Sequence, residues 1–313
     1  MINFKLIFIS LFLCTLAFSD DYIKIELSDS KNKLSKEVFQ KLQKNHYLKK
    51  INTNDLNERY FEAIIQKFDE NKNLLLEEEI QTYLKQSRNV NENYFDIKLA
   101  YELINLYFER LIQYSKYQIS LVKKDSFDFS KDEFLDIYYE DNQWQSNLDG
   151  LKNIWRLETK NDLLALKLSD SSSSKPQNDL IKRYQNRIRR INQQKEEDIF
   201  SLAINILTNQ FDPHSSYLSP RSAEDFELNM SLKLSGIGAL LGIEDDYTKI
   251  INLVPGGPAE KSGRINPEDR ITKIRQNGSS EFVDVVGWRI DEVVDLIRGC
   301  LLYTSDAADE LRS

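Results

Sequence analysis

The distribution of glycine and proline is the strongest constraint on the fold of this chain. The first glycine is Gly150 and the first proline is Pro176, whereas nine of the ten glycines fall between Gly236 and Gly299. A β-sandwich or β-barrel needs both residue types in its turns, so about 150 residues without either are unsuited to such folds. The sequence therefore predicts an all-helical front half, followed by a smaller part that is built differently.

Apolar residues in the front half recur at intervals of three, four and five, which is typical of helices with one buried face. Two such stripes are Leu56, Tyr60, Phe61, Ile64, Ile65 and Phe68, and Leu99, Leu103, Ile104, Tyr107, Phe108, Leu111 and Ile112. Further helices are predicted from a capping box at Ser130–Glu133 and from Leu180 to about Gln210, with a flexible loop at 169–179 before the latter. We predict a helical N-terminal domain over residues 20–230.

The N-terminus has the features of a secretory signal peptide. Lys5 is followed by an apolar run from Leu6 to Phe18, and Ala17 and Ser19 place small residues where signal peptidase reads them. This apolar run is shorter than a membrane-spanning helix usually is. Cys14 does not fit a lipidation site, because Leu13 stands where a small residue is needed. We predict a signal peptide at residues 1–19, with membrane contact only during export.

The charge balance argues against nucleic acid as a partner. The formal net charge is -8, whereas phosphate binding needs concentrated Lys and Arg. One basic run, Lys182–Arg190, is interleaved with apolar residues at helical spacing, and we interpret it as a solvated helix face. No nucleic-acid partner is expected.

Two groups of polar residues imitate metal sites. Asp69–Asn73 begins like a calcium-binding loop, but Leu74 and Ile80 occupy the positions that require glycine and a bidentate glutamate, so we interpret it as a turn between two helices. Asp212 and His214 have no third ligand nearby, and we assign them a structural hydrogen-bonding role. The sequence predicts no metal site and no cofactor.

From Ser235 onward, the pattern changes to strands and turns. We expect strands at 237–243, 248–254 and 269–274, a short helix after Pro255–Ala259 that stops at Gly263, a hairpin turn at Asn277–Gly278 and a helix at 286–298. Ser222 is expected to cap another short helix before this region. A glycine-rich loop, a strand and a later helix are the parts that hold an extended peptide by its terminal carboxylate.

The residues of this region resemble a bacterial PDZ domain. The matching motifs are Ser235-Gly236-Ile237-Gly238-Ala239, Val254–Gly263 and Leu296-Ile297-Arg298-Gly299. Together with Glu197-Asp198-Ile199-Phe200, Phe211–Arg221 and Asp284–Arg289, they resemble the tail-specific protease, or C-terminal processing peptidase (family S41), of Gram-negative bacteria. The resemblance extends from about residue 40 to Gly299.

This resemblance implies a periplasmic serine endopeptidase with a Ser/Lys dyad, which selects proteins by their apolar C-termini. Its location would be the periplasm, including the periplasmic face of the inner membrane, with an accessory lipoprotein as an optional partner. By analogy, the peptide-binding residues are those of the carboxylate-binding loop with the following strand, and those of the later helix: Gly236, Ile237, Gly238, Ala239, Leu240, Leu241, Val293, Val294 and Ile297.

The sequence departs from the family pattern after Gly299. The expected fold is a mainly α N-terminal region followed by an α+β PDZ domain at 231–299 whose final strands are missing, and we interpret residues 300–313 as non-native. No catalytic residue is assigned, because no Ser or Lys here matches the dyad, so this chain is expected to be inactive by itself.

The alternative function is a secreted, non-catalytic PDZ adaptor that binds C-terminal peptides. A helical repeat protein fits less well, because no period recurs.

Overall fold

The computed structural model describes residues 22–47, 53–88, 95, 97–124, 127–136, 142–168, 175–230, 236–276 and 280–298. Four predicted features lie wholly or largely outside these residues: the signal peptide with Cys14, the centre of the serine-rich loop, the Asn277–Gly278 turn and the tail at 300–313. They stay predictions.

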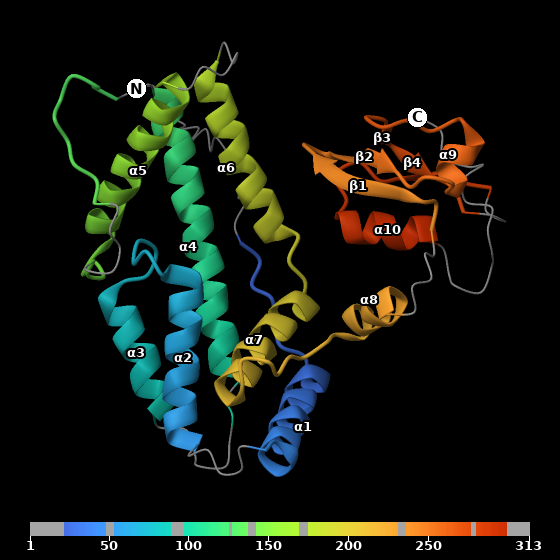
Figure 1. Ribbon diagram of the computed structural model, residues 1–313. Helices are drawn as coiled ribbons and strands as arrows, with labels where there is room; N and C mark the ends of the chain where they lie inside the picture. Colours follow the sequence, from blue (N-terminus) through green and yellow to red (C-terminus); the bar gives the residue numbers. More distant parts are fainter. Residues whose placement is uncertain are drawn as a thin grey trace, which may run out of the picture.

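The N-terminal region is helical, as the absence of glycine and proline predicts (Figure 1). Its helices are α1 (Asp29–Asn45), α2 (Thr53–Asp69), α3 (Glu77–Arg88), α4 (Ile97–Lys124), α5 (Leu148–Leu168), α6 (Pro176–Asn192), α7 (Glu196–Phe211) and α8 (Pro220–Met230). The 28-residue α4 runs through the middle, with α2, α5, α6 and α7 packed against it. Within the described part of the chain, no helix combines the length and apolar character needed to cross a membrane.

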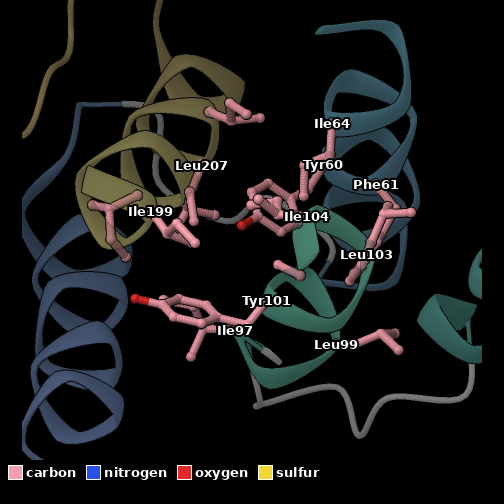
Figure 2. Close-up of a cluster of buried hydrophobic side chains, with 14 of the residues drawn as sticks. Tyr60, Phe61, Ile64, Ile97, Leu99, Tyr101, Leu103, Ile104, Ile199 and Leu207 are labelled. Carbon is pink, nitrogen blue, oxygen red and sulfur yellow. The ribbon is translucent and has the colours of Figure 1, made fainter. Parts of the chain in front are cut away.

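The main core lies where α2, α4 and α7 meet (Figure 2). The two predicted apolar stripes supply most of its α2 and α4 side chains, and Tyr60, Phe61 and Ile64 are fully buried. Ile199 and Leu207 of α7 complete the contact from the other side (Figure 2). The predicted helix faces are therefore confirmed, because only the apolar side of each helix can leave water at this junction.

The helix predicted from Leu180 to Gln210 is wrong in two respects. It begins earlier, at Pro176, since proline fits the first turn of a helix, where the missing N–H needs no partner. It is also interrupted between α6 and α7, where the backbone N–H of Lys195 donates to Asp198 Oδ2 at 2.8 Å. This carboxylate satisfies a free amide at the start of α7 and so favours a new helix over a continuous one.

Two other predicted helix starts are wrong. Residues 127–136 form no helix, because the backbone N–H and hydroxyl of Ser130 both donate to Asp128 Oδ1, at 3.0 and 2.6 Å, in place of a capping box. The helix that Ser222 was expected to cap begins at Pro220, and Ser219 Oγ accepts the N–H of Ser222 at 3.1 Å. Short polar side chains compete for the same amides, and local geometry selects among them.

Asp69 organises the turn between α2 and α3. Its side chain is almost fully buried, and Oδ1 accepts the N–H groups of Asn73 and Leu74 at 2.9 and 3.0 Å. Oδ2 accepts the N–H of Leu75 at 2.9 Å and the indole N–H of Trp144 at 3.3 Å. Burial raises the pKa of the Asp69 carboxyl to about 6, although these donors act in the opposite direction. The residues that resembled a calcium loop thus form the predicted helix–helix turn.

The C-terminal part is the predicted α+β unit (Figure 1). Its elements are β1 (Ala239–Glu244), β2 (Tyr247–Leu253), α9 (Pro258–Ser262), β3 (Arg270–Ile271), β4 (Lys273–Ile274), β5 (Val283–Asp284) and α10 (Ile290–Arg298). β1, β2 and β3 form an antiparallel sheet in that order, and β4 pairs with β5. Gly263 ends α9 with a φ of 64°, as predicted. The expected strand at 269–274 is split into β3 and β4, and the last helix starts at Ile290 rather than Val286.

Candidate functional site

The loop before β1 presents backbone amides that have no partner among the residues that the structure describes. The carbonyl of Ile237 accepts the N–H of Ala259 at 2.8 Å, and the carbonyl of Gly238 accepts the N–H of Val254 at 2.8 Å. Within the described residues, the N–H groups of Ile237 and Gly238 donate to no acceptor. A loop whose carbonyls are engaged while its amides are free is suited to receive an anion such as a carboxylate.

Gly238 is required by the geometry of this loop. Its φ of 75° lies in the left-handed region, which disfavours residues with a side chain. A Cβ at this position would lie 3.1 Å from Gly257 Cα and 3.2 Å from Pro258 Cδ. The turn that opens α9 therefore packs directly against the loop and holds it in place.

β1 continues from the loop and offers a free edge. It pairs on one side with β2, and among the described residues its other side has no strand partner. Leu241 packs on the core of this unit, while Leu240 and Ile243 are 59% and 63% exposed. An unpaired strand edge with exposed apolar side chains can accept an extended peptide as an additional strand.

The residues predicted on α10 do not share one environment. Val293 and Ile297 belong to the core, with exposures of 0% and 6%, so they support the helix from within. Val294 is half-buried, and Ile290, also half-buried, lies one turn earlier on the same helix face. Ile290 was not among the residues predicted for the site.

Asp212 makes structural hydrogen bonds, as predicted, whereas His214 takes part in them through its backbone N–H. Asp212 Oδ2 accepts the Tyr47 hydroxyl at 2.6 Å, and Oδ1 accepts the backbone N–H of His214 at 2.7 Å. The bond from Tyr47 is the main reason that the pKa of Asp212 is lowered. No group of three or more potential metal ligands occurs among the residues that the structure places.

Comparison with known families identifies the helical region. Residues 38–221 match the tail-specific protease N-terminal domain, and this match covers more than half of the chain. The chain belongs to the tail-specific protease family. Residues 225–301 match the PDZ domain, which agrees with the loop, strand and helix described above.

Curated relatives give the same picture. The chain is 33% identical over 276 residues to the tail-specific protease of Haemophilus influenzae, a match that covers 87% of this chain and 39% of the relative. It is 40% identical over 88 residues to the carboxy-terminal processing protease CtpA of Bacillus subtilis, covering 28% of this chain and 17% of the relative. The match thus spans about two fifths of the length of the Haemophilus influenzae protein and a smaller share of the Bacillus subtilis protein.

Among solved structures, the chain is similar to the PDZ domain of a carboxy-terminal protease from Vibrio cholerae in complex with peptide. The identity is 55%, the match covers 21% of this chain and 66% of that chain, and the TM-score is 0.20.

Proposed function

We propose that this chain is the substrate-selecting part of a periplasmic tail-specific serine endopeptidase. In this proposal the PDZ domain binds the apolar C-terminus of a substrate protein, and the Ser/Lys dyad that cleaves it lies outside this chain. Family membership supports the protease class. The recognition step is supported by the geometry of the loop and the strand that follows it.

One observation carries the recognition step. Among the described residues, the amides of Ile237 and Gly238 have no acceptor, and they lie at the start of a strand edge that no described strand pairs with. A peptide that pairs with β1 would bring its terminal carboxylate to these amides, where charge-assisted hydrogen bonds form. Leu240 and Ile243 are exposed along the same strand and would favour apolar side chains in the peptide. The free carboxylate would therefore be the main determinant of binding.

Amidation of the peptide terminus should weaken binding by at least about tenfold, because it removes the charge that the two amides receive. The measurement is fluorescence anisotropy of the chain with a labelled peptide that ends in Ala, Val or Leu. A matched peptide that ends in Asp tests the apolar preference and should also bind more weakly. Equal affinity for the free and amidated peptides would contradict the assigned role of the loop.

The chain by itself should not cleave such peptides. A Ser/Lys mechanism requires a lysine of lowered pKa beside the nucleophilic serine, and no residue of this chain has been assigned to either role. The test is incubation of the purified chain with a protein substrate that ends in apolar residues, followed by mass spectrometry. Cleavage that a serine-directed inhibitor abolishes would show that the dyad lies within this chain.

A further inference from the structure

The helical region contacts the PDZ domain at the far end of β1. Lys182 Nζ of α6 pairs with Asp245 of the β1–β2 turn at 2.6 Å. Arg189, also on α6, pairs with Asp246 and donates to the carbonyl of Asp245 at 3.1 Å. These two cations belong to the basic run that the sequence indicated as a solvated face. Their contacts hold the β1–β2 hairpin at the end opposite to the carboxylate-binding loop.

A second set of contacts holds the start of α10. Arg289 pairs with Asp198 at the start of α7, with one bond of 3.1 Å between Nη2 and Oδ1, and its Nη1 donates to the carbonyl of Gln193 at 2.9 Å. Gln193 in turn donates through Nε2 to the carbonyl of Gly287 at 2.7 Å. The Arg289 side chain is only 22% exposed, and its pKa is raised chiefly by the bond to Asp198.

The Arg289–Asp198 pair is one of several contacts that join α10 to the helical region. Lys195 pairs with Glu292, and Arg221 of α8 binds Asp291 and, through both Nη atoms, Asp295. The Arg289–Asp198 pair is bidentate and less exposed than the Arg221–Asp295 pair, and a planar guanidinium fixes the orientation of a carboxylate better than a single charge does. Both partners also stabilise helix starts, because Asp198 accepts the N–H of Lys195 and the carbonyl of Arg289 accepts the N–H of Val293 at 3.1 Å. This one pair therefore joins the first turn of α7 to the first turn of α10.

We propose that Arg289 is a positioning residue of the peptide site, and that its pair with Asp198 sets the distance between α10 and β1. This inference rests on the proposed function. The β1–β2 hairpin is held by α6, and the start of α10 is held by the α6–α7 turn. The helical region therefore fixes both β1 and α10, the two elements that would flank a bound peptide. When the pair is lost, Arg221 and Lys195 still contact the first turn of α10, but that turn is less firmly fixed, and part of the binding free energy is then spent on positioning it.

The decisive variant is Asp198→Asn. The asparagine oxygen still accepts the N–H of Lys195, so the start of α7 is preserved, while Arg289 loses its charged partner. We expect the full chain to bind an apolar peptide with a free carboxylate about fivefold to twentyfold more weakly. Asp225→Asn is the matched control, because its pair with Arg298 is exposed and lies at the other end of α10, and affinity should change less than about twofold.

Two further measurements separate positioning from a general structural effect. Arg289→Gln should weaken binding at least as much as Asp198→Asn, because it also removes the bonds to the Gln193 carbonyl and to Asp291. The double variant should lose little more than Arg289→Gln, because the Arg289–Asp198 pair is already absent in that single variant. The chain contains three tryptophans, and 5-fluorotryptophan labelling gives each a ¹⁹F resonance. The resonance of Trp288, next to Arg289, should shift in Asp198→Asn, whereas those of Trp144 and Trp155 should not.

The outcomes distinguish this inference from the proposed function. If the wild-type chain binds the peptide in a carboxylate-dependent way and Asp198→Asn binds equally well, the inference is overturned and the proposed function stands. If the wild-type chain shows no carboxylate-dependent binding, both are overturned. A loss of affinity in Asp198→Asn and Arg289→Gln, without loss in Asp225→Asn and with non-additive effects, supports the inference.

Discussion

Replacing Asp69 by alanine should lower the free energy of unfolding of the helical region by about 3 kcal/mol at pH 7. The substitution leaves four donors without an acceptor, namely the N–H groups of Asn73, Leu74 and Leu75 and the indole of Trp144. Each buried donor that loses its partner costs about 1 kcal/mol or more, and release of a buried carboxylate offsets part of the sum. The measurement is urea denaturation followed by far-UV circular dichroism.

The pH dependence provides a second readout of the same variant. Burial raises the pKa of Asp69 to about 6, above its ordinary value of 3.8, so the folded state binds this proton more tightly than the unfolded state. The resulting stability is fully present below about pH 4 and is lost as the pH rises through 6. The difference between wild type and Asp69→Ala should therefore be larger at pH 5 than at pH 8.

Glu70→Ala is the control for this prediction. Glu70 is the adjacent carboxylate, it is exposed, and it makes no hydrogen bond or ion pair among the described residues. Its replacement should change stability by less than about 0.5 kcal/mol at either pH. If Asp69→Ala and Glu70→Ala had equal effects, the assigned role of Asp69 in the turn would be wrong.

Replacing Gly238 by valine should weaken binding of a C-terminal peptide by about 100-fold. The new side chain would occupy a left-handed backbone position and would lie within 3.2 Å of atoms of Gly257 and Pro258. The loop must then move, and the amides of Ile237 and Gly238 lose their alignment with the carboxylate. Two charge-assisted hydrogen bonds contribute about 3 kcal/mol, which corresponds to roughly two orders of magnitude in affinity.

Gly256→Val separates crowding in the loop from general backbone strain. Gly256 has a φ of 73°, close to that of Gly238, but a Cβ there would meet nothing within 4 Å. Gly256→Val should lose about as much stability from backbone strain as Gly238→Val does, but its affinity for the peptide should stay within about threefold of the wild-type value. Thermal unfolding of both variants checks that the PDZ domain remains folded at the temperature of the binding assay. Equal loss of affinity in the two would contradict the specific role of Gly238.

Much of the fold follows from local patterns in the sequence. The absence of glycine and proline before Gly150 predicted helices, and the apolar stripes identified the faces of α2 and α4 that the core buries. The order of loop, strands and helices in the PDZ domain, and the left-handed Gly263, also followed from short motifs. These features depend on residues within one or two turns of each other, so a linear pattern contains them.

The candidate site was predictable only in part. The loop at Gly236–Ala239 stays a prediction from the family resemblance, whereas two of the three residues predicted on α10, Val293 and Ile297, lie in the core. Helix periodicity shows that residues share a stripe, but it does not show which edge of that stripe faces a neighbouring strand. That edge depends on how α10 lies against β1, which is set by packing between segments far apart in the sequence.

Polar partners were decided by the tertiary structure. Ser130 bonds to Asp128 rather than starting a helix, and the Asp69 carboxylate accepts hydrogen bonds from backbone N–H groups of the turn and from the indole of Trp144. Arg289 and Asp198 are separated by 91 positions in the sequence. The sequence by itself determined the helical character of the N-terminal region, the order of the PDZ elements and the family, because local spacing contains these features, whereas several helix boundaries differed. Only the folded chain determined which charges meet, because a charged side chain has many possible partners and packing of distant segments selects one.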